Sequence, residues 1–127
     1  MQNKQVTKVY CWIFALTAVL HTVSFLRSVY AIGHNSASLT PSNLLVFVLF
    51  EAVVAAVTGM AWWAILKGEV WARACGIAAS LMYILIFLRP IILHWRTHHL
   101  GALVIGVLGL VHFLGRYEQH DPNPRTT

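Results

Sequence analysis

Acidic residues are scarce in this chain of 127 residues, which has four of them against nine lysines and arginines and a formal net charge of +5. The acids are Glu51, Glu69, Glu118 and Asp121. Hydrolytic and phosphoryl-transfer sites need paired carboxylates, a nucleophile triad or a phosphate-binding loop, and the sequence contains no such pattern. It therefore favours a non-enzymatic role without excluding catalysis.

Charge of either sign is also rare. Charged residues make up 10% of the chain and hydrophobic residues 58%, with a mean hydropathy of +0.69. Soluble domains carry about 25% charged residues, and a chain this short has too much surface to hide so many apolar side chains. We therefore expect the lipid bilayer to be its solvent. The cations stand at the ends of apolar runs, which is typical of membrane proteins and predicts no nucleic-acid partner.

Cysteine is too rare for a disulfide framework. The two thiols, Cys11 and Cys75, are expected near the cytoplasmic edge of the membrane, where cysteines stay reduced and pack as small apolar residues.

Four apolar runs predict an all-α integral membrane bundle of four transmembrane helices. A spanning helix needs about 20 residues. The first three runs are long enough, and the fourth is long enough only if His98 and Arg116 lie in the interfaces. The predicted helices cover 9–30, 44–66, 71–93 and 98–116, in a single domain 1–117 followed by a flexible polar tail, 118–127. Pro41 is expected in the first turn of the second helix, and Lys67–Glu69 in a tight turn.

The distribution of cations predicts the orientation. With the N-terminus inside, six lysines and arginines face the cytoplasm and three, Arg27, Arg89 and Arg96, face outward. This bias favours a multi-pass protein of the inner (plasma) membrane with both termini cytoplasmic. An alternative stays open, in which the first run is a signal peptide cleaved near 29–31.

Three polar residues on three predicted helices share one depth. His21, Glu51 and Tyr83 each lie about 18 Å from the inner edge of the hydrocarbon core. Ionisable residues inside a span are expensive and are functional candidates by default. We predict that the three form a cluster. It either binds a ligand or protons, or is a hydrogen-bonded clasp that sets helix packing.

Haem is not predicted. The two histidines within spans, His21 and His112, lie about 18 Å and about 9 Å from the inner edge. Two axial ligands of one iron must lie at nearly the same level. His112 is instead expected to form a hydrogen bond with a neighbour near the inner boundary.

A histidine-rich segment, "HWRTHH" at 94–99, is expected in the outer loop before the fourth helix. Together with Arg27, Arg89 and Arg96 it predicts an outer cationic cluster that contacts lipid phosphates or a partner protein. The spacing of His94, His98 and His99 leaves a surface zinc or copper site as the alternative, although no acidic or thiolate ligand is nearby. No cofactor is otherwise predicted.

The segment Gly68–Arg73 carries the pattern G-x-x-W-A-R at the start of the third helix. It resembles a feature of small, uncharacterised four-helix proteins of the bacterial inner membrane. The resemblance implies an architecture and no activity.

Three functions follow as hypotheses. The leading one is a non-enzymatic accessory or interaction protein that docks a membrane-protein partner or a second copy. Its small-residue faces are Ala52, Ala55, Ala56 and Gly59 on the second helix and Ala102 and Gly106 on the fourth. The second is a small carrier or a lipid- or quinone-binding protein that uses His21, Glu51 and Tyr83. The third is a metal or redox module that uses the outer histidines.

Overall fold

The computed structural model describes residues 2–34, 41–94 and 100–116, and this part of the chain is all-α, without strands. Its side chains are described within 4–34, 45–88 and 100–115. The elements are α1 (Gln2–Gly33), α2 (Pro41–Lys67), α3 (Ala72–His94), α4 (Leu100–Val111) and a π-helical turn, η2 (His112–Arg116). The prediction of an all-α chain with four helices is confirmed.

α1 and α2 extend beyond the apolar runs that predicted them, whereas α3 lies within one residue of its predicted range, and α4 begins at Leu100 rather than at 98 and ends in the π-helical turn. α1 begins at Gln2, well before the predicted start near Val9. Gln and Lys are good helix formers, so the helix continues into its polar flank at little cost. α2 begins at Pro41, a residue whose fixed φ suits the first helical position. Hydropathy therefore marks the part of a helix suited to lipid, while the ends are set by other residues.

The connection between α2 and α3 is a Schellman motif. Gly68 has a φ of 69°, which an L side chain rarely adopts, and its N–H donates to the carbonyl of Ile65 at 3.3 Å. The Glu69 N–H donates to the carbonyl of Ala64 at 3.0 Å. Both bonds satisfy carbonyls that the end of α2 leaves without helical partners. The glycine in the predicted tight turn thus ends α2 and lets α3 begin at Ala72.

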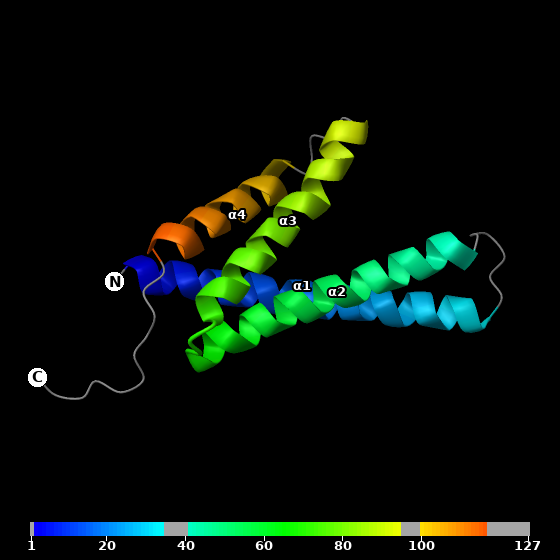
Figure 1. The fold of residues 1–127 in the computed structure, drawn as a ribbon, viewed down its shortest axis with the longest axis horizontal. Coiled ribbons are helices and arrows are strands. Elements are labelled where there is room, and N and C mark those ends of the chain that lie inside the picture. The colour runs from blue at the N-terminus through cyan, green and yellow to red at the C-terminus, as the bar shows by residue number, and fades with distance from the viewer. Residues whose placement is uncertain (1, 35–40, 95–99, 117–127) are drawn as a thin grey trace, which may run out of the picture.

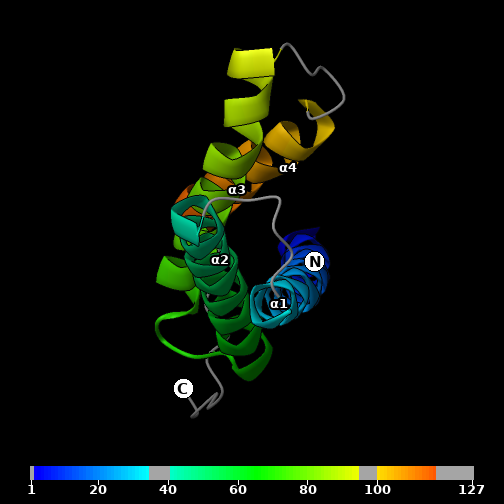
Figure 2. The same cartoon turned by 90° about the vertical axis from the view of Figure 1, so that its right-hand side faces the viewer.

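The four helices form two hairpins that diverge. α1 packs along α2, and α3 packs along α4. In Figure 1 the α1–α2 hairpin runs to the right while α3 and α4 rise away from it, and Figure 2 shows the same separation from the side. The start of α1 lies next to the end of α4 in Figure 1. The hairpins therefore meet at one end of the molecule and separate toward the other.

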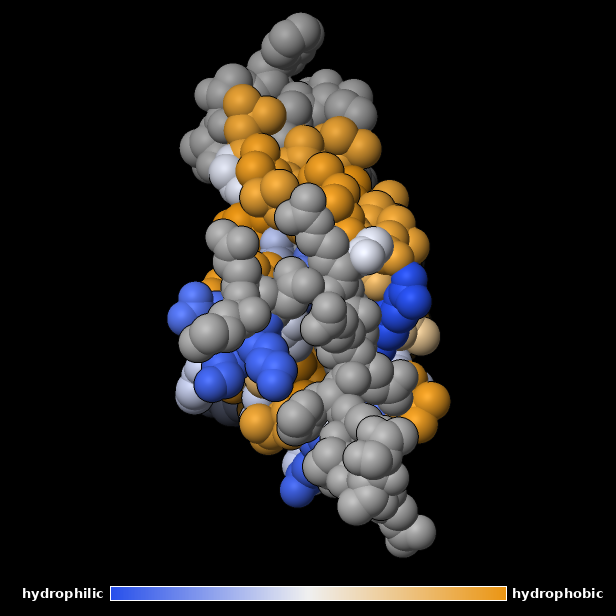
Figure 3. All heavy atoms as spheres, turned by 90° about the vertical axis from the view of Figure 1, so that its left-hand side faces the viewer, coloured by the Kyte–Doolittle hydropathy of each residue, from blue (hydrophilic) through white to orange (hydrophobic). Residues whose placement is uncertain are grey.

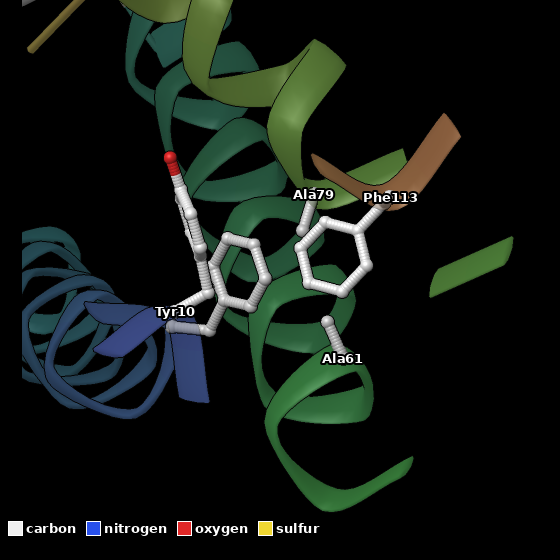
Figure 4. Packing of buried hydrophobic residues seen from close by; sticks show 5 residues of the cluster. Tyr10, Ala61, Ala79 and Phe113 are labelled. Atoms are coloured by element: carbon white, nitrogen blue, oxygen red, sulfur yellow. The ribbon is translucent and has the colours of Figure 1, made fainter. Parts of the chain in front are cut away.

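The meeting point is built around one aromatic cluster, here called the inner core: Tyr10, Phe14, Ala61, Ala79 and Phe113. Figure 4 shows the Phe113 ring between Ala61 of α2 and Ala79 of α3. Phe113 is fully buried, and its ring centroid lies 5.7 Å from that of Tyr10, edge to face. This geometry suits the aromatic quadrupole. Two alanines leave room for the ring, so side chains from α1, α2, α3 and the π-helical turn η2 meet here.

Most large apolar side chains point outward. Trp12 is 76% exposed and Leu85 68% exposed, whereas the buried set includes Thr17, Thr58 and Ser80. Figure 3 shows hydrophobic side chains over the upper part of one face, where α3 and α4 rise, with hydrophilic ones gathered below. Two helices are long and apolar enough to cross a membrane, at Lys4–Gly33 and Leu45–Lys67. The apolar segments of the other two, Ala72–Leu88 and Leu100–Gly115, are shorter.

Candidate functional site: a buried histidine–glutamate pair beside a groove

His21 and Glu51 lie on the adjacent helices α1 and α2, and their side chains touch. The distance from His21 Nδ1 to Glu51 Oε2 is 2.6 Å. The Glu51 side chain is 7% exposed and the His21 side chain 22% exposed. A buried carboxylate is costly unless it is hydrogen-bonded, and the imidazole supplies that bond. The structure thus brings together two of the three residues of the predicted cluster.

The contact determines what the imidazole presents to a ligand. An ionised carboxylate only accepts hydrogen bonds, so with Glu51 ionised the Nδ1 atom of His21 carries the hydrogen. The other ring nitrogen, Nε2, is then an acceptor in the neutral ring and a donor in the protonated ring. The His21 side chain as a whole remains partly exposed, so the pair is not sealed from its surroundings.

Tyr83 contacts a different residue from the one predicted. Its hydroxyl lies 2.9 Å from Thr17 Oγ1, one turn along α1 from His21. The Thr17 hydroxyl donates to the carbonyl of Ile13 at 2.8 Å, so it accepts from Tyr83. The resulting chain of bonds links α3 to α1. Thr17 lies on the same helical face as His21, and this spacing was the available signal for its part in the contact.

A groove of about 480 Å³ lies beside the pair, and its lining begins at Leu20, next to His21, without including His21 or Glu51 themselves. It runs along the end of α1 coloured cyan in Figure 1, which projects past α3 and α4. Its lining comes mainly from α1 and includes Leu20, Val23, Ser24, Arg27, Ser28 and, from α2, Phe47. Sites for small molecules have volumes of about 300 to 1,000 Å³ and combine apolar walls with a few polar groups. The groove has that composition.

A second set of polar contacts lies around the inner core, at the end of the molecule where the hairpins meet, which is called the inner end below. Thr7 Oγ1 lies 2.9 Å from Nε2 of His112, and the Tyr10 hydroxyl donates to the carbonyl of Ile105 at 2.9 Å. The expected hydrogen bond from His112 to a neighbour is confirmed. Fourteen residues separate Thr7 from His21 along α1, or about 21 Å. Because Thr7 contacts His112, this separation between the two histidines is larger than the difference of about 9 Å in depth predicted from the sequence.

Sequence reasoning missed the role of Arg73, which it treated only as a cytoplasmic cation. The guanidinium donates to the carbonyl of Phe113 through Nε at 2.9 Å and to the carbonyl of Leu114 through Nη2. A cation at a helix C-terminus satisfies free carbonyls and opposes the helix dipole. An arginine at the start of α3 is the signal, but its target is visible only once α4 is in place.

The two predicted docking faces differ in accessibility. Gly106 is buried against α3, where an added Cβ would lie 3.0 Å from Ile84 Cγ1. The α4 face is therefore used for internal packing. Gly59 packs loosely against α1, since a Cβ there would meet Ala18 Cβ at 3.8 Å. A groove between α1 and α2 remains open here, lined in part by Ala15, Ala18, Ala55, Gly59 and Trp62.

Most of the predicted outer cluster lies outside the described residues. Arg27 is exposed and lines the groove. The side chains of Arg89 and His94, and residues Arg96, His98 and His99, are not among those described, and neither is the predicted tail, 118–127. Within the described part of the chain, no three histidine, cysteine or acidic side chains gather as a metal site. A zinc or copper site at the outer histidines stays a prediction.

No family model, curated protein or solved structure matches this chain.

Proposed function

We propose that this chain is a non-enzymatic integral membrane protein that binds a lipid-like, amphipathic molecule beside the His21–Glu51 pair. In the proposed topology four helices span the membrane and both termini lie in the cytoplasm, as the distribution of cations favours. α3 has 23 residues and is about 35 Å long, enough to cross a hydrocarbon core of about 30 Å. α4 spans with its π-helical end in the interface.

One observation carries the proposal. A buried carboxylate holds a partly exposed imidazole, and an open groove lies beside this pair, lined by neighbouring residues of α1 and α2 such as Leu20 and Phe47. A clasp that served helix packing alone needs no accessible imidazole and no groove, and ionisable residues at this depth are costly to keep. A ligand with a polar group and an apolar body matches the pair and the walls beside it.

A second candidate function is the docking of a partner helix, and the open groove between α1 and α2 favours it. Alanines and a glycine line this groove at Ala15, Ala18, Ala55 and Gly59. Small residues let helix backbones approach closely in membranes. The second predicted docking face, on α4, is not open to a partner because Gly106 is buried against α3. For this reason we rank ligand binding above partner docking.

The test is the substitution Glu51→Gln in the full chain, purified in mild detergent. The amide keeps the size of the side chain and accepts from Nδ1 but removes the charge that orients the imidazole. We expect affinity for a short-chain quinone or a dioleoyl phospholipid, measured by native mass spectrometry, to fall about tenfold. The helix content by circular dichroism should stay unchanged.

Thr58→Val is the matched control. Thr58 is a fully buried polar residue on the same helix, and its hydroxyl donates only within α2, to the carbonyl of Val54 at 2.7 Å. It should leave affinity for both probes unchanged. If Glu51→Gln lowers thermal stability while probe binding is unaffected, the pair is a structural clasp and ligand binding there is refuted. A stoichiometric membrane protein that co-purifies in that case would favour the docking function.

A further inference from the structure

The groove beside the pair changes in composition along α1, with Leu20 and Val23 in its inner part and Arg27 and Ser28 in its outer part, before Ala31. Arg27 lies six residues beyond His21 on α1, about 9 Å further along the helix axis. In the proposed topology this places Arg27 at about 27 Å in a core of about 30 Å, at the level of lipid head groups. Leu20 and Val23 lie deeper on α1, at the level of acyl chains, and Phe47 of α2 lies between them and Arg27.

Arg27 has no carboxylate partner among the described residues. The ion pair found there joins His21 to Glu51, which is a different contact. Glu69 stands at the opposite end of α2, and the remaining acids, Glu118 and Asp121, lie outside the described residues. A guanidinium at the edge of a low-dielectric region attracts an anion, and charge-assisted hydrogen bonds are the strong ones.

The hydroxyl groups next to Arg27 supply further contacts. Ser28 Oγ donates to the carbonyl of Ser24 at 3.0 Å, so the Ser28 oxygen is free only to accept. The Ser24 hydroxyl lines the same groove and can donate to an anionic oxygen. A guanidinium and a hydroxyl donor at one end of an apolar groove match a head group that carries negative charge.

We propose that the Arg27 groove binds an anionic phospholipid of the bilayer, with its phosphate at Arg27 and Ser24 and its acyl chain against the deeper residues Leu20 and Val23. This inference rests on the proposed function and names the class of its ligand. A neutral quinone leaves the guanidinium without a counter-ion. A free phosphate ion leaves the apolar walls exposed to solvent, so the lipid satisfies both ends at once.

The experiment uses the full chain in a nonionic detergent and follows its thermal unfolding. The probes are dioleoyl phosphatidylglycerol, dioleoyl phosphatidylcholine, which has the same tails without net charge, and inorganic phosphate. We expect phosphatidylglycerol to bind roughly fivefold more tightly than phosphatidylcholine. Arg27→Gln should abolish this preference, and Arg27→Lys should restore most of it. Inorganic phosphate should give no shift.

Two more variants separate the groove from general charge effects. Lys8→Gln removes an exposed cation from the other end of α1 and should keep the full lipid preference. Ala31→Phe fills the mouth of the groove without changing charge and should weaken binding of both phospholipids, since Ala31 is part of the lining.

The outcomes distinguish the inference from the proposed function. Equal binding of both phospholipids, with no effect of Arg27→Gln, overturns the anionic lipid while the Glu51-dependent binding site stands. An equal shift with inorganic phosphate overturns the lipid in favour of a simple anion site. If no amphipathic probe binds and Glu51→Gln changes nothing, the proposed function fails along with the inference.

Discussion

The two ends of the molecule are held together in different ways. At the inner end, rings, alanines and glycines from four helices interlock, and Arg73 bonds to the end of the π-helical turn. At the outer end the two hairpins separate, and among the side chains described there the polar pair His21–Glu51 joins α1 to α2. Close packing makes protein interiors stiff. The inner end is therefore built as a rigid base, and we expect the outer end, where the proposed ligand binds, to be the more adaptable of the two.

The two ends also differ in the kind of side chain that they bury. The inner core buries aromatic side chains, which gain dispersion energy from every neighbour. The outer half instead buries a carboxylate and leaves an arginine at a groove. Neither the buried carboxylate nor the arginine at the groove improves packing. Locally unfavourable choices of this kind concentrate at functional sites, so the outer half is the place to look for a ligand.

The largest effect is expected at Phe113. Phe113→Ala removes a fully buried ring that contacts Tyr10 and Phe14 and lies between two helices. The cavity should lower the free energy of unfolding by about 3 kcal/mol, measured in mixed micelles with increasing sodium dodecyl sulfate. Leu114→Ala is the control, because Leu114 is the next residue and is 51% exposed. Equal losses in the two variants would refute a rigid inner core.

Much of this architecture was accessible from the sequence. Apolar runs marked all four helices, and the glycine at 68 marked the turn that ends α2. Counting residues along α1 and α2 placed His21 and Glu51 at one level, and their side chains touch. Depth follows from rise per residue alone, which is why this contact was predictable without a packing model.

Other contacts depend on how the hairpins dock, and no local pattern encodes that. Gly76 leaves the space that the Phe113 ring fills, an arrangement that requires the register of α3 against α4. The bonds from Arg73 to the π-helical turn need the same information. Tyr83 was placed at the right depth but bonds to Thr17, because depth says nothing about the rotation of α3 about its axis.

A smaller loss of unfolding free energy is expected for a substitution at Gly109, which tests whether the helices at the inner end can move apart. A Cβ there would lie 2.7 Å from Ser80 Oγ and 2.8 Å from Tyr10 Cε1. Neither neighbour is free to move, since Ser80 donates to the carbonyl of Gly76 at 2.8 Å and Tyr10 is bonded to the carbonyl of Ile105. Gly109→Ala should therefore cost about 2 kcal/mol in the same unfolding assay.

Gly101→Ala is the control for Gly109→Ala, because nothing lies within 4 Å of its added Cβ. There the helical preference of alanine should leave stability equal or slightly higher. A Gly109→Ala protein as stable as the control would mean that α3 and α4 shift easily, and the contrast between the two ends would be lost.

The smallest effect concerns the last contact before the hairpins separate. The Tyr83 hydroxyl donates to Thr17 Oγ1 across 2.9 Å, and hydrogen bonds between helices in membranes contribute about 0.6 kcal/mol on average. Tyr83→Phe and Thr17→Val should each destabilise by about 1 kcal/mol or less, and a double-mutant cycle should give a coupling of that average size. The predicted cost of Gly109→Ala at the inner end is roughly 2 kcal/mol. If the coupling energy between Tyr83 and Thr17 exceeds this value, their hydrogen bond is part of the rigid inner end. The more adaptable region would then begin further along α1.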